Sequence, residues 1–138
     1  MFFISPLEGL RSLKGIKMKI NIYLIFSLLY MVLIFFLSSY PTPIRTPSFA
    51  LFDKIVHMVE FGVLALLIYL ALRDTNAAKH HLFVLAFMIT FLYGVSDEIH
   101  QYFVPGRKAD IFDVIANGIG AFCFLMVIRL KGLLITAN

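Results

Sequence analysis

Cysteine is nearly absent from this sequence. The chain has one, Cys123, which lies between Phe122 and Phe124 in an apolar run. A single thiol excludes an intramolecular disulfide and a metal site built from paired cysteines. In such a run Cys123 behaves as a small hydrophobic residue, so it indicates no redox compartment.

Charged residues are also scarce. They make up 14% of the 138 residues, whereas 61% are hydrophobic, and the mean hydropathy is +0.92. This composition excludes an ordinary soluble domain and is typical of one compact integral-membrane domain. The formal net charge is +4, but the basic residues are dispersed between apolar runs and do not alternate with stacking aromatics. We therefore expect membrane lipids as partners and no nucleic acid.

Apolar runs separated by polar turns predict an all-α fold, a membrane bundle of four transmembrane helices. The expected helices cover about residues 20–38, 53–72, 82–103 and 110–130. The first run holds about nineteen residues without a charge, enough at 1.5 Å per residue to cross a hydrocarbon core of roughly 30 Å. It exceeds the apolar region of a signal peptide, and Pro41 and Pro43 follow it as a helix stop, so we expect it to stay uncleaved.

Three further features define the predicted domain organisation. A basic segment, 1–19, precedes the transmembrane domain at 20–131, and a short tail, 132–138, follows it. Met18 offers an alternative start to Met1. The prolines between Pro41 and Phe52 predict a loop, and the Val104-Pro105-Gly106-Arg107 sequence predicts a tight turn.

The distribution of basic residues predicts the orientation of the bundle. Four spans place both termini on one side of the membrane. The terminal side carries Arg11, Lys14, Lys17, Lys19, Arg73, Lys79, Arg129 and Lys131, and the opposite side carries Arg45, Lys54, Arg107 and Lys108. Because basic residues concentrate on the cytoplasmic side, we expect both termini to be cytoplasmic.

Most acidic residues fall near the opposite, outer ends of the predicted helices. At about 100° per residue, Asp53, His57 and Glu60 share one helix face, and so do Asp97 and Gln101. On the predicted helix 110–130, Asp110, Asp113 and Asn117 also share one face. Gly120 and Ala121 extend this face with small side chains that allow close helix approach. The predicted ligand-binding residues are Asp53, His57, Glu60, Asp97, Glu98, Gln101, Arg107, Asp110, Asp113 and Asn117.

The depth of this polar layer makes it a candidate site. Counting residues inward from the helix ends places Glu60, Asp97 and Asn117 roughly 9 to 10 Å below the outer boundary. Ionisable groups at such depth are costly and mark functional sites by default. The layer is therefore predicted to be shallow, converging and open to the outside. Ion transport is the least favoured function, because the cytoplasmic halves of the helices are nearly uniformly apolar.

Several chemistries remain open for this layer. Carboxylates and histidines on facing helices can form a metal or acid/base site, and His57-x-x-Glu60 and Glu98-x-His100 could supply ligands, although neither is an HExxH motif. Arg107 could instead receive an anionic group. The same residues could also serve only to hold the helices together.

The polar layer resembles a known pattern. The residues that carry the resemblance are Asp53-Lys54, His57, Phe61, Asp97-Glu98, Gln101, Phe103, Pro105-Gly106-Arg107, Asp110, Asp113, Asn117 and Gly120. Their spacing is similar to that of the VanZ-like family of small membrane proteins, over roughly Ala50 to Ala121. The chain departs from the family at Tyr40, where glutamine often precedes the proline.

This resemblance implies a multi-pass protein of the bacterial cell membrane. The named member of the family is associated with reduced susceptibility to the glycopeptide antibiotic teicoplanin. The expected function is a polar, outward-facing site that binds or shields a lipid-associated ligand, such as a lipid-linked wall precursor or a lipoglycopeptide. The alternative is an intramembrane acid/base or metal-assisted enzyme that acts on a lipid-linked envelope substrate.

Overall fold

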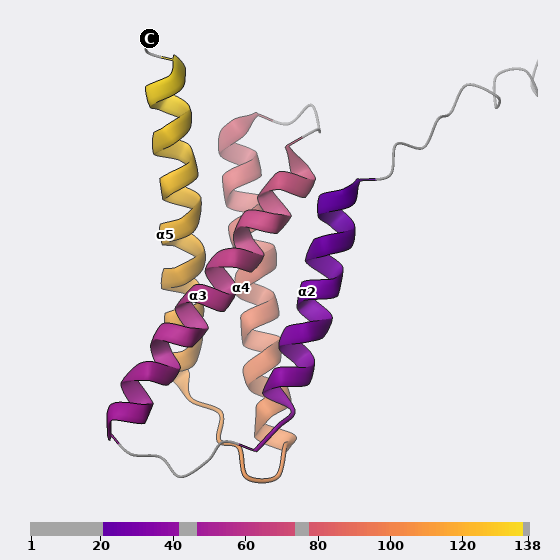
Figure 1. The fold of residues 1–138 in the computed structure, drawn as a ribbon, viewed down its shortest axis with the longest axis vertical. Helices are drawn as coiled ribbons and strands as arrows, with labels where there is room; N and C mark the ends of the chain where they lie inside the picture. The colour runs from indigo at the N-terminus through magenta and orange to yellow at the C-terminus, as the bar shows by residue number, and fades with distance from the viewer. Residues whose placement is uncertain (1–20, 42–46, 74–77, 137–138) are drawn as a thin grey trace, which may run out of the picture.

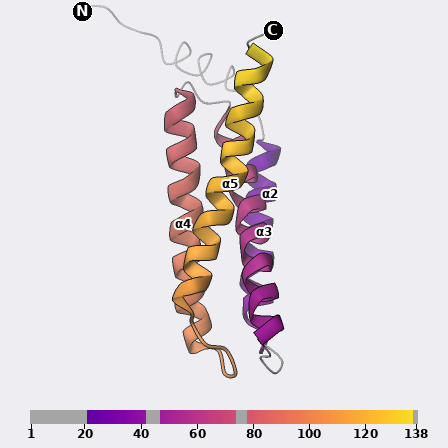
Figure 2. The same ribbon diagram turned by 90° about the vertical axis from the view of Figure 1, so that its left-hand side faces the viewer.

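Helices are the only regular secondary structure in the described part of the chain. The computed structural model describes residues 21–41, 47–73 and 78–136. Its helices are α2 (Ile22–Ser38), α3 (Pro47–Leu72), α4 (Lys79–Phe103) and α5 (Ile111–Thr136) (Figure 1). The start of α2 and the end of α5 lie at the same end of the bundle (Figures 1 and 2). This confirms the all-α, four-helix prediction, while the membrane side of these ends stays a prediction.

Three of the helices are long and apolar enough to cross a membrane. They contain the spans Leu51–Leu72, His81–Phe103 and Ile111–Lys131. The remaining helix, α2, is apolar but has 17 residues. At 1.5 Å per residue it measures about 25 Å, near the lower limit for a spanning helix.

Helix α3 begins earlier than the sequence pattern predicted. It starts at Pro47, within the predicted loop up to Phe52 and ahead of the expected start near residue 53. Proline is well suited to the first helical position, because its missing N–H would have no intrahelical partner there. Pro47 therefore begins the helix within the segment that was predicted to be a loop.

Two other helix boundaries also differ from the prediction. Helix α4 starts at Lys79, before the predicted residue 82, because lysine and histidine are acceptable in a helical first turn. Helix α5 extends to Thr136, past the predicted end at 130 and into the predicted tail. One glycine, Gly132, weakens a helix without necessarily ending it. The predicted segment 1–19 and the alternative start at Met18 lie outside the described residues.

Helix α3 is the centre of the bundle. It packs against α2, α4 and α5, and its most extensive contact is with α5. The buried core is formed by Ile34, Phe61, Leu64, Ala65, Ile68, Ala86, Ala121 and Leu125. The α3–α5 contact is close because Gly120 has no side chain: a β-carbon there would lie 2.0 Å from the carbonyl oxygen of Met58. This confirms the predicted role of small residues on that face of α5.

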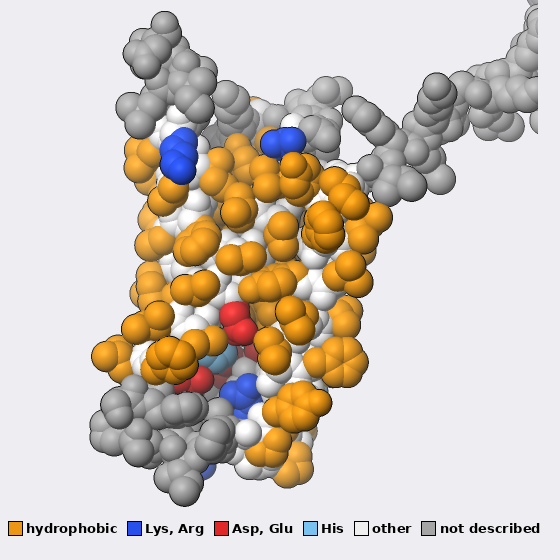
Figure 3. Space-filling model, viewed as in Figure 1, with side chains coloured by type: hydrophobic (Ala, Val, Ile, Leu, Met, Phe, Trp, Pro, Cys, Tyr) orange, Lys and Arg blue, Asp and Glu red, His pale blue; other side chains and the backbone are white. Residues whose placement is uncertain are grey.

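The outward surface of the bundle is apolar. Helix α2 illustrates this, because the side chains of Leu29 and Phe36 are 60% and 58% exposed. In Figure 3 hydrophobic side chains cover most of the visible surface, with lysine and arginine at the upper end and a group of charged side chains low in the molecule. An apolar area of this extent is suited to lipid.

Candidate functional site

A polar pocket of about 310 Å³ lies between α2, α3 and α4, near the end of the bundle away from the termini. It is lined by Ile34, Leu37, Ser38, Asp53, Val56, His57, Glu60, Asp97, Gln101 and Arg107. Its charged side chains are visible on the lateral surface between α3 and α2 (Figure 3). The pocket therefore borders the apolar outer surface of the bundle.

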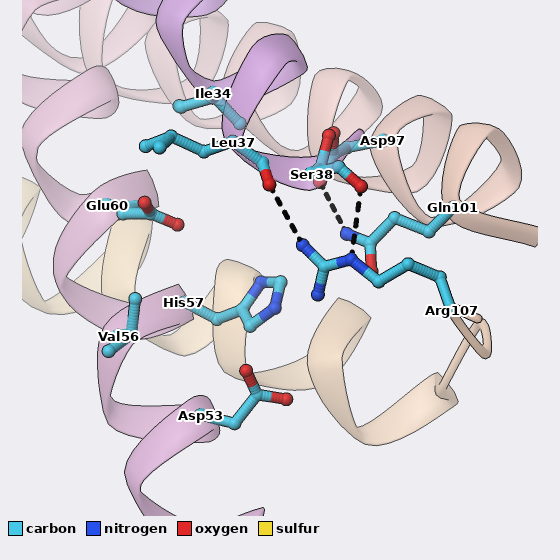
Figure 4. Close-up of a pocket in the computed structure, with 10 residues that line it drawn as sticks. All are labelled: Ile34, Leu37, Ser38, Asp53, Val56, His57, Glu60, Asp97, Gln101 and Arg107. Atoms are coloured by element: carbon cyan, nitrogen blue, oxygen red, sulfur yellow. Dashed lines mark hydrogen bonds between the residues drawn. The ribbon is translucent and has the colours of Figure 1, made fainter. Parts of the chain in front are cut away.

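Helix α3 contributes the wall with free hydrogen-bond acceptors. Asp53, His57 and Glu60 all line the pocket, as their shared helix face predicted (Figure 4). Among the described residues, no hydrogen bond or ion pair reaches the carboxylates of Asp53 and Glu60. Both carboxylates can therefore accept hydrogen bonds from a molecule in the pocket.

His57 is held in one orientation by α5. Its Nδ1 lies 3.0 Å from Oδ1 of Asn117, and both residues are buried. In a neutral imidazole that donates from Nδ1 to this amide oxygen, Nε2 is an acceptor. Nε2 has no hydrogen-bond partner among the described residues.

The α4 side of the layer joins helices to one another. Asp97 accepts hydrogen bonds from the Ser38 hydroxyl at 2.6 Å and from Nε2 of Gln101 at 2.8 Å. Glu98 accepts the backbone N–H of Asp110 at 3.0 Å and does not line the pocket. Asp97 and Gln101 thus share a face, as predicted, and the bond from Ser38 to Asp97 links α2 to α4.

Lys54 neutralises the negative charge of two carboxylates at the start of α5. Its ammonium lies 2.7 Å from the carboxylate of Asp110 and also contacts Asp113, whose exposed fraction is 1%. Neither acid lines the pocket. Lys54 was not among the predicted ligand-binding residues. The signal for its role was a cation near the start of one predicted helix and two acids, Asp110 and Asp113, at the start of the last.

Arg107 reaches across the pocket entrance to α2. Its Nε donates to the carbonyl of Ser38 at 3.1 Å, and Nη2 donates to the carbonyl of Leu37 at 3.3 Å. These are terminal carbonyls of α2, where a cation is favourable. The preceding Gly106 has a φ of +85°, a conformation that suits glycine and directs the turn back toward α2. The guanidinium lies beside Asp97 and Gln101 (Figure 4).

The comparison with known proteins agrees with this geometry. The VanZ/LLP1 family model matches residues 5–132. The chain belongs to this family. No curated protein and no solved structure matches it. The match confirms the resemblance seen in the sequence, and together with the three long apolar helices it identifies this VanZ/LLP1 chain as a membrane protein.

The predicted residues of this VanZ/LLP1 protein fall into two groups. Those that line the pocket are Asp53, His57, Glu60, Asp97, Gln101 and Arg107. Those that stand behind it and connect helices are Glu98, Asp110, Asp113 and Asn117. Ser38 completes the lining and was not predicted, because a serine at a helix end is common and gives no distinct signal.

The VanZ/LLP1 chain also contains a possible cation-binding set. Among the described residues, one ligand atom each from Asp53, His57 and Asp113 lies within 4.8 Å of the others. This set differs from the pairs His57 with Glu60 and Glu98 with His100 that the sequence suggested. His100 lies outside it, 3.0 Å from the Ser39 hydroxyl. The ammonium of Lys54 already contacts Asp113, so a bound cation would have to displace it.

Proposed function

We propose that this chain is a multi-pass protein of the bacterial cell membrane that binds or shields the polar part of a lipid-associated ligand. One observation supports this most directly. Most acids of the polar layer have partners within the fold, but Asp53 and Glu60 face a laterally open pocket and have no hydrogen-bond or ion-pair partner in the part of the chain that the structure describes. Carboxylates without partners are costly at membrane depth. Hydrogen-bond donors of a ligand offset that cost.

We also propose that both termini are cytoplasmic and that the pocket faces outward. The exposed residues Arg73, Arg129 and Lys131 are located at the terminal end of the bundle. At the other end, Lys54 and Arg107 are engaged with Asp110, Asp113 and the end of α2. In the sequence eight basic residues are assigned to the terminal side and four to the opposite side, and this bias supports the positive-inside orientation.

Labelling of introduced cysteines tests this orientation. In a Cys123→Ser background, Glu60→Cys is expected to react with a membrane-impermeant maleimide added to intact cells, because position 60 borders the open pocket. Asn117→Cys is the control and is expected to stay unlabelled, because position 117 has no exposed surface. Labelling of Glu60→Cys only after permeabilisation would show that the pocket faces the cytoplasm.

Removing the negative charges of the pocket tests its ligand-binding role. Asp53→Asn and Glu60→Gln preserve side-chain size and remove an acceptor charge. Each is expected to weaken ligand binding about tenfold, the usual effect of one charged hydrogen bond, and to raise the teicoplanin susceptibility of the host toward that of a deletion strain. The control is Ser96→Ala, an exposed residue that bonds only its own helix. If both pocket variants, expressed at the parental level, protect as well as the parent, the proposed role of the pocket fails.

An intramembrane, metal-assisted enzyme is the second candidate. It is favoured by the proximity of Asp53, His57 and Asp113 and by the bond from His57 to Asn117, since histidine ligands are commonly oriented through their second nitrogen. The purified parent protein is then expected to contain about one divalent ion, and the purified His57→Ala variant is expected to contain none. Deleting the gene is expected to change the lipid profile of the host. No bound metal and an unchanged profile in the deletion strain would contradict this candidate.

A further inference from the structure

An apolar groove of about 340 Å³ is lined by residues of α2 and α3, two of the helices that also line the polar pocket. It is lined by Phe26, Leu29, Tyr30, Leu33 and Leu67. Four of these residues belong to α2 and one to α3, so the groove follows the same α2–α3 junction as the pocket. Its lining is composed of hydrophobic and aromatic side chains, whereas the pocket is lined by Asp53, His57, Glu60 and other polar residues.

The groove and the pocket follow one another along this junction. On α2, Leu33 lines the groove and the next residue, Ile34, lines the pocket. On α3, Glu60 lines the pocket and Leu67 lines the groove, about two turns or roughly 10 Å along the same helix face. An apolar section therefore continues into a polar one, which is the order of a hydrocarbon chain and a head group.

The arrangement of free acceptors indicates the head group. Asp53 and Glu60 are about two helical turns apart, with the acceptor Nε2 of His57 between them in sequence. A head group with several hydroxyls can donate to acceptors that are spread over two helical turns, whereas one ammonium group offers a single point of contact. A phosphate is disfavoured, because three carboxylates and one guanidinium line the pocket and Arg107 already donates to α2.

We propose that the pocket and the groove together bind a glycolipid: an uncharged sugar head group in the polar pocket and one hydrocarbon chain in the groove. This rests on the proposed function, since it names the chemical class of ligand for the same pocket. Hydroxyl groups of the sugar donate to Asp53, Glu60 and Nε2 of His57. The remaining N–H groups of Arg107 donate to sugar oxygens. The chain replaces a membrane lipid tail along α2.

The test uses a photoreactive alkyl maltoside with a diazirine in its alkyl chain. Full-length protein in phosphatidylcholine nanodiscs is irradiated with this probe, and the labelled residues are located by peptide mass spectrometry. A matched probe has the same chain on a polyoxyethylene head, which lacks the sugar hydroxyls. The maltoside is expected to label residues of the groove about tenfold more than the ether probe does.

Two variants distinguish the groove from general lipid contact. Leu33→Trp fills the groove and is expected to reduce maltoside labelling about tenfold. Leu28→Trp is the control, because Leu28 is an exposed residue of α2 that does not line the groove. Glu60→Gln is expected to reduce labelling by a similar factor without altering the ether probe.

The possible failures are separable. If Glu60→Gln reduces maltoside labelling, but the labels are spread over the outer surface and Leu33→Trp has no effect, the pocket binds a head group and the groove proposal is wrong. If the two probes label equally in the parent and in Glu60→Gln, the pocket selects no sugar. The glycolipid proposal is then wrong, and the proposed function still has its own test in the teicoplanin response of Asp53→Asn and Glu60→Gln.

Discussion

Replacing Gly120 with alanine is expected to destabilise the bundle more than the same replacement at any other described glycine. The new β-carbon would lie 2.0 Å from the carbonyl oxygen of Met58 and 2.6 Å from its Cα. Both are backbone atoms, so no side-chain rotation relieves the overlap and α3 must move away from α5. Overpacking typically costs 1–3 kcal/mol, and we expect about 3 kcal/mol here. The thermal unfolding midpoint in mild detergent measures this effect.

A second glycine of the same helix provides the control. At Gly118 a β-carbon would meet only the ring of Phe91, at 3.3 Å, and a ring can shift by the required few tenths of an ångström. Alanine also favours the helix by up to about 1 kcal/mol over glycine. Gly118→Ala is therefore expected to unfold close to the parent. Equal midpoints for Gly120→Ala and the parent would contradict the close approach of α3 and α5.

The Gly120→Ala variant is also expected to affect the pocket through the packing of α3 against α5. Met58 follows His57 in α3, and Asn117 lies one turn before Gly120 in α5. Separation of the two helices at this point lengthens the bond between His57 and Asn117, which is 3.0 Å in the parent. The orientation of the imidazole at the pocket wall thus depends on a glycine that does not line the pocket.

Replacing Lys54 with methionine is expected to have the second large effect. Methionine keeps the length of the apolar stem and removes the ammonium that contacts Asp110 and Asp113. Asp113 is then a buried carboxylate without a counter-charge. Removing one partner of a buried ion pair costs 3–5 kcal/mol, and because Lys54 is partly exposed we expect about 3 kcal/mol. Thermal unfolding in detergent again provides the measurement.

Two further variants identify the cause of this loss. Lys54→Met combined with Asp113→Asn removes the stranded charge and is expected to recover more than half of the lost stability. Lys131→Met removes an exposed lysine at the other end of the bundle and is expected to change stability by less than about 0.5 kcal/mol. If Lys54→Met unfolds at the same temperature as Lys131→Met, the ion pairs contribute little and α5 is held by packing alone.

Much of the architecture could be predicted from local sequence patterns. Long apolar runs are costly in water and favourable in lipid, so they indicate helices for a membrane without knowledge of their neighbours. Helical periodicity likewise places Asp53, His57 and Glu60 on one face. Boundaries were less predictable, because Pro47 can follow a loop or begin a helix, and only the position of its neighbours distinguishes the two.

The chemistry of the polar layer was less accessible from the sequence. Asp97 and Glu60 both appear as acids inside apolar helices, and periodicity treats them alike. In the structure Asp97 accepts bonds from Ser38 and Gln101, whereas Glu60 has no such partner among the described residues. The partners of Asp97 include a residue of another helix, which no local pattern identifies. The contact of Lys54 with Asp113 is equally remote in sequence.

The sequence by itself determined that the protein is a helical membrane protein of the VanZ/LLP1 family, and that acids, a histidine and an arginine gather near one end of its helices. Hydrophobicity and helical periodicity depend only on nearby residues, and so they can be read locally. The tertiary structure alone decided which of these groups are paired and which face the pocket. That division depends on how closely α3 and α5 approach at Gly120 and on how the turn at Gly106 directs Arg107 to α2.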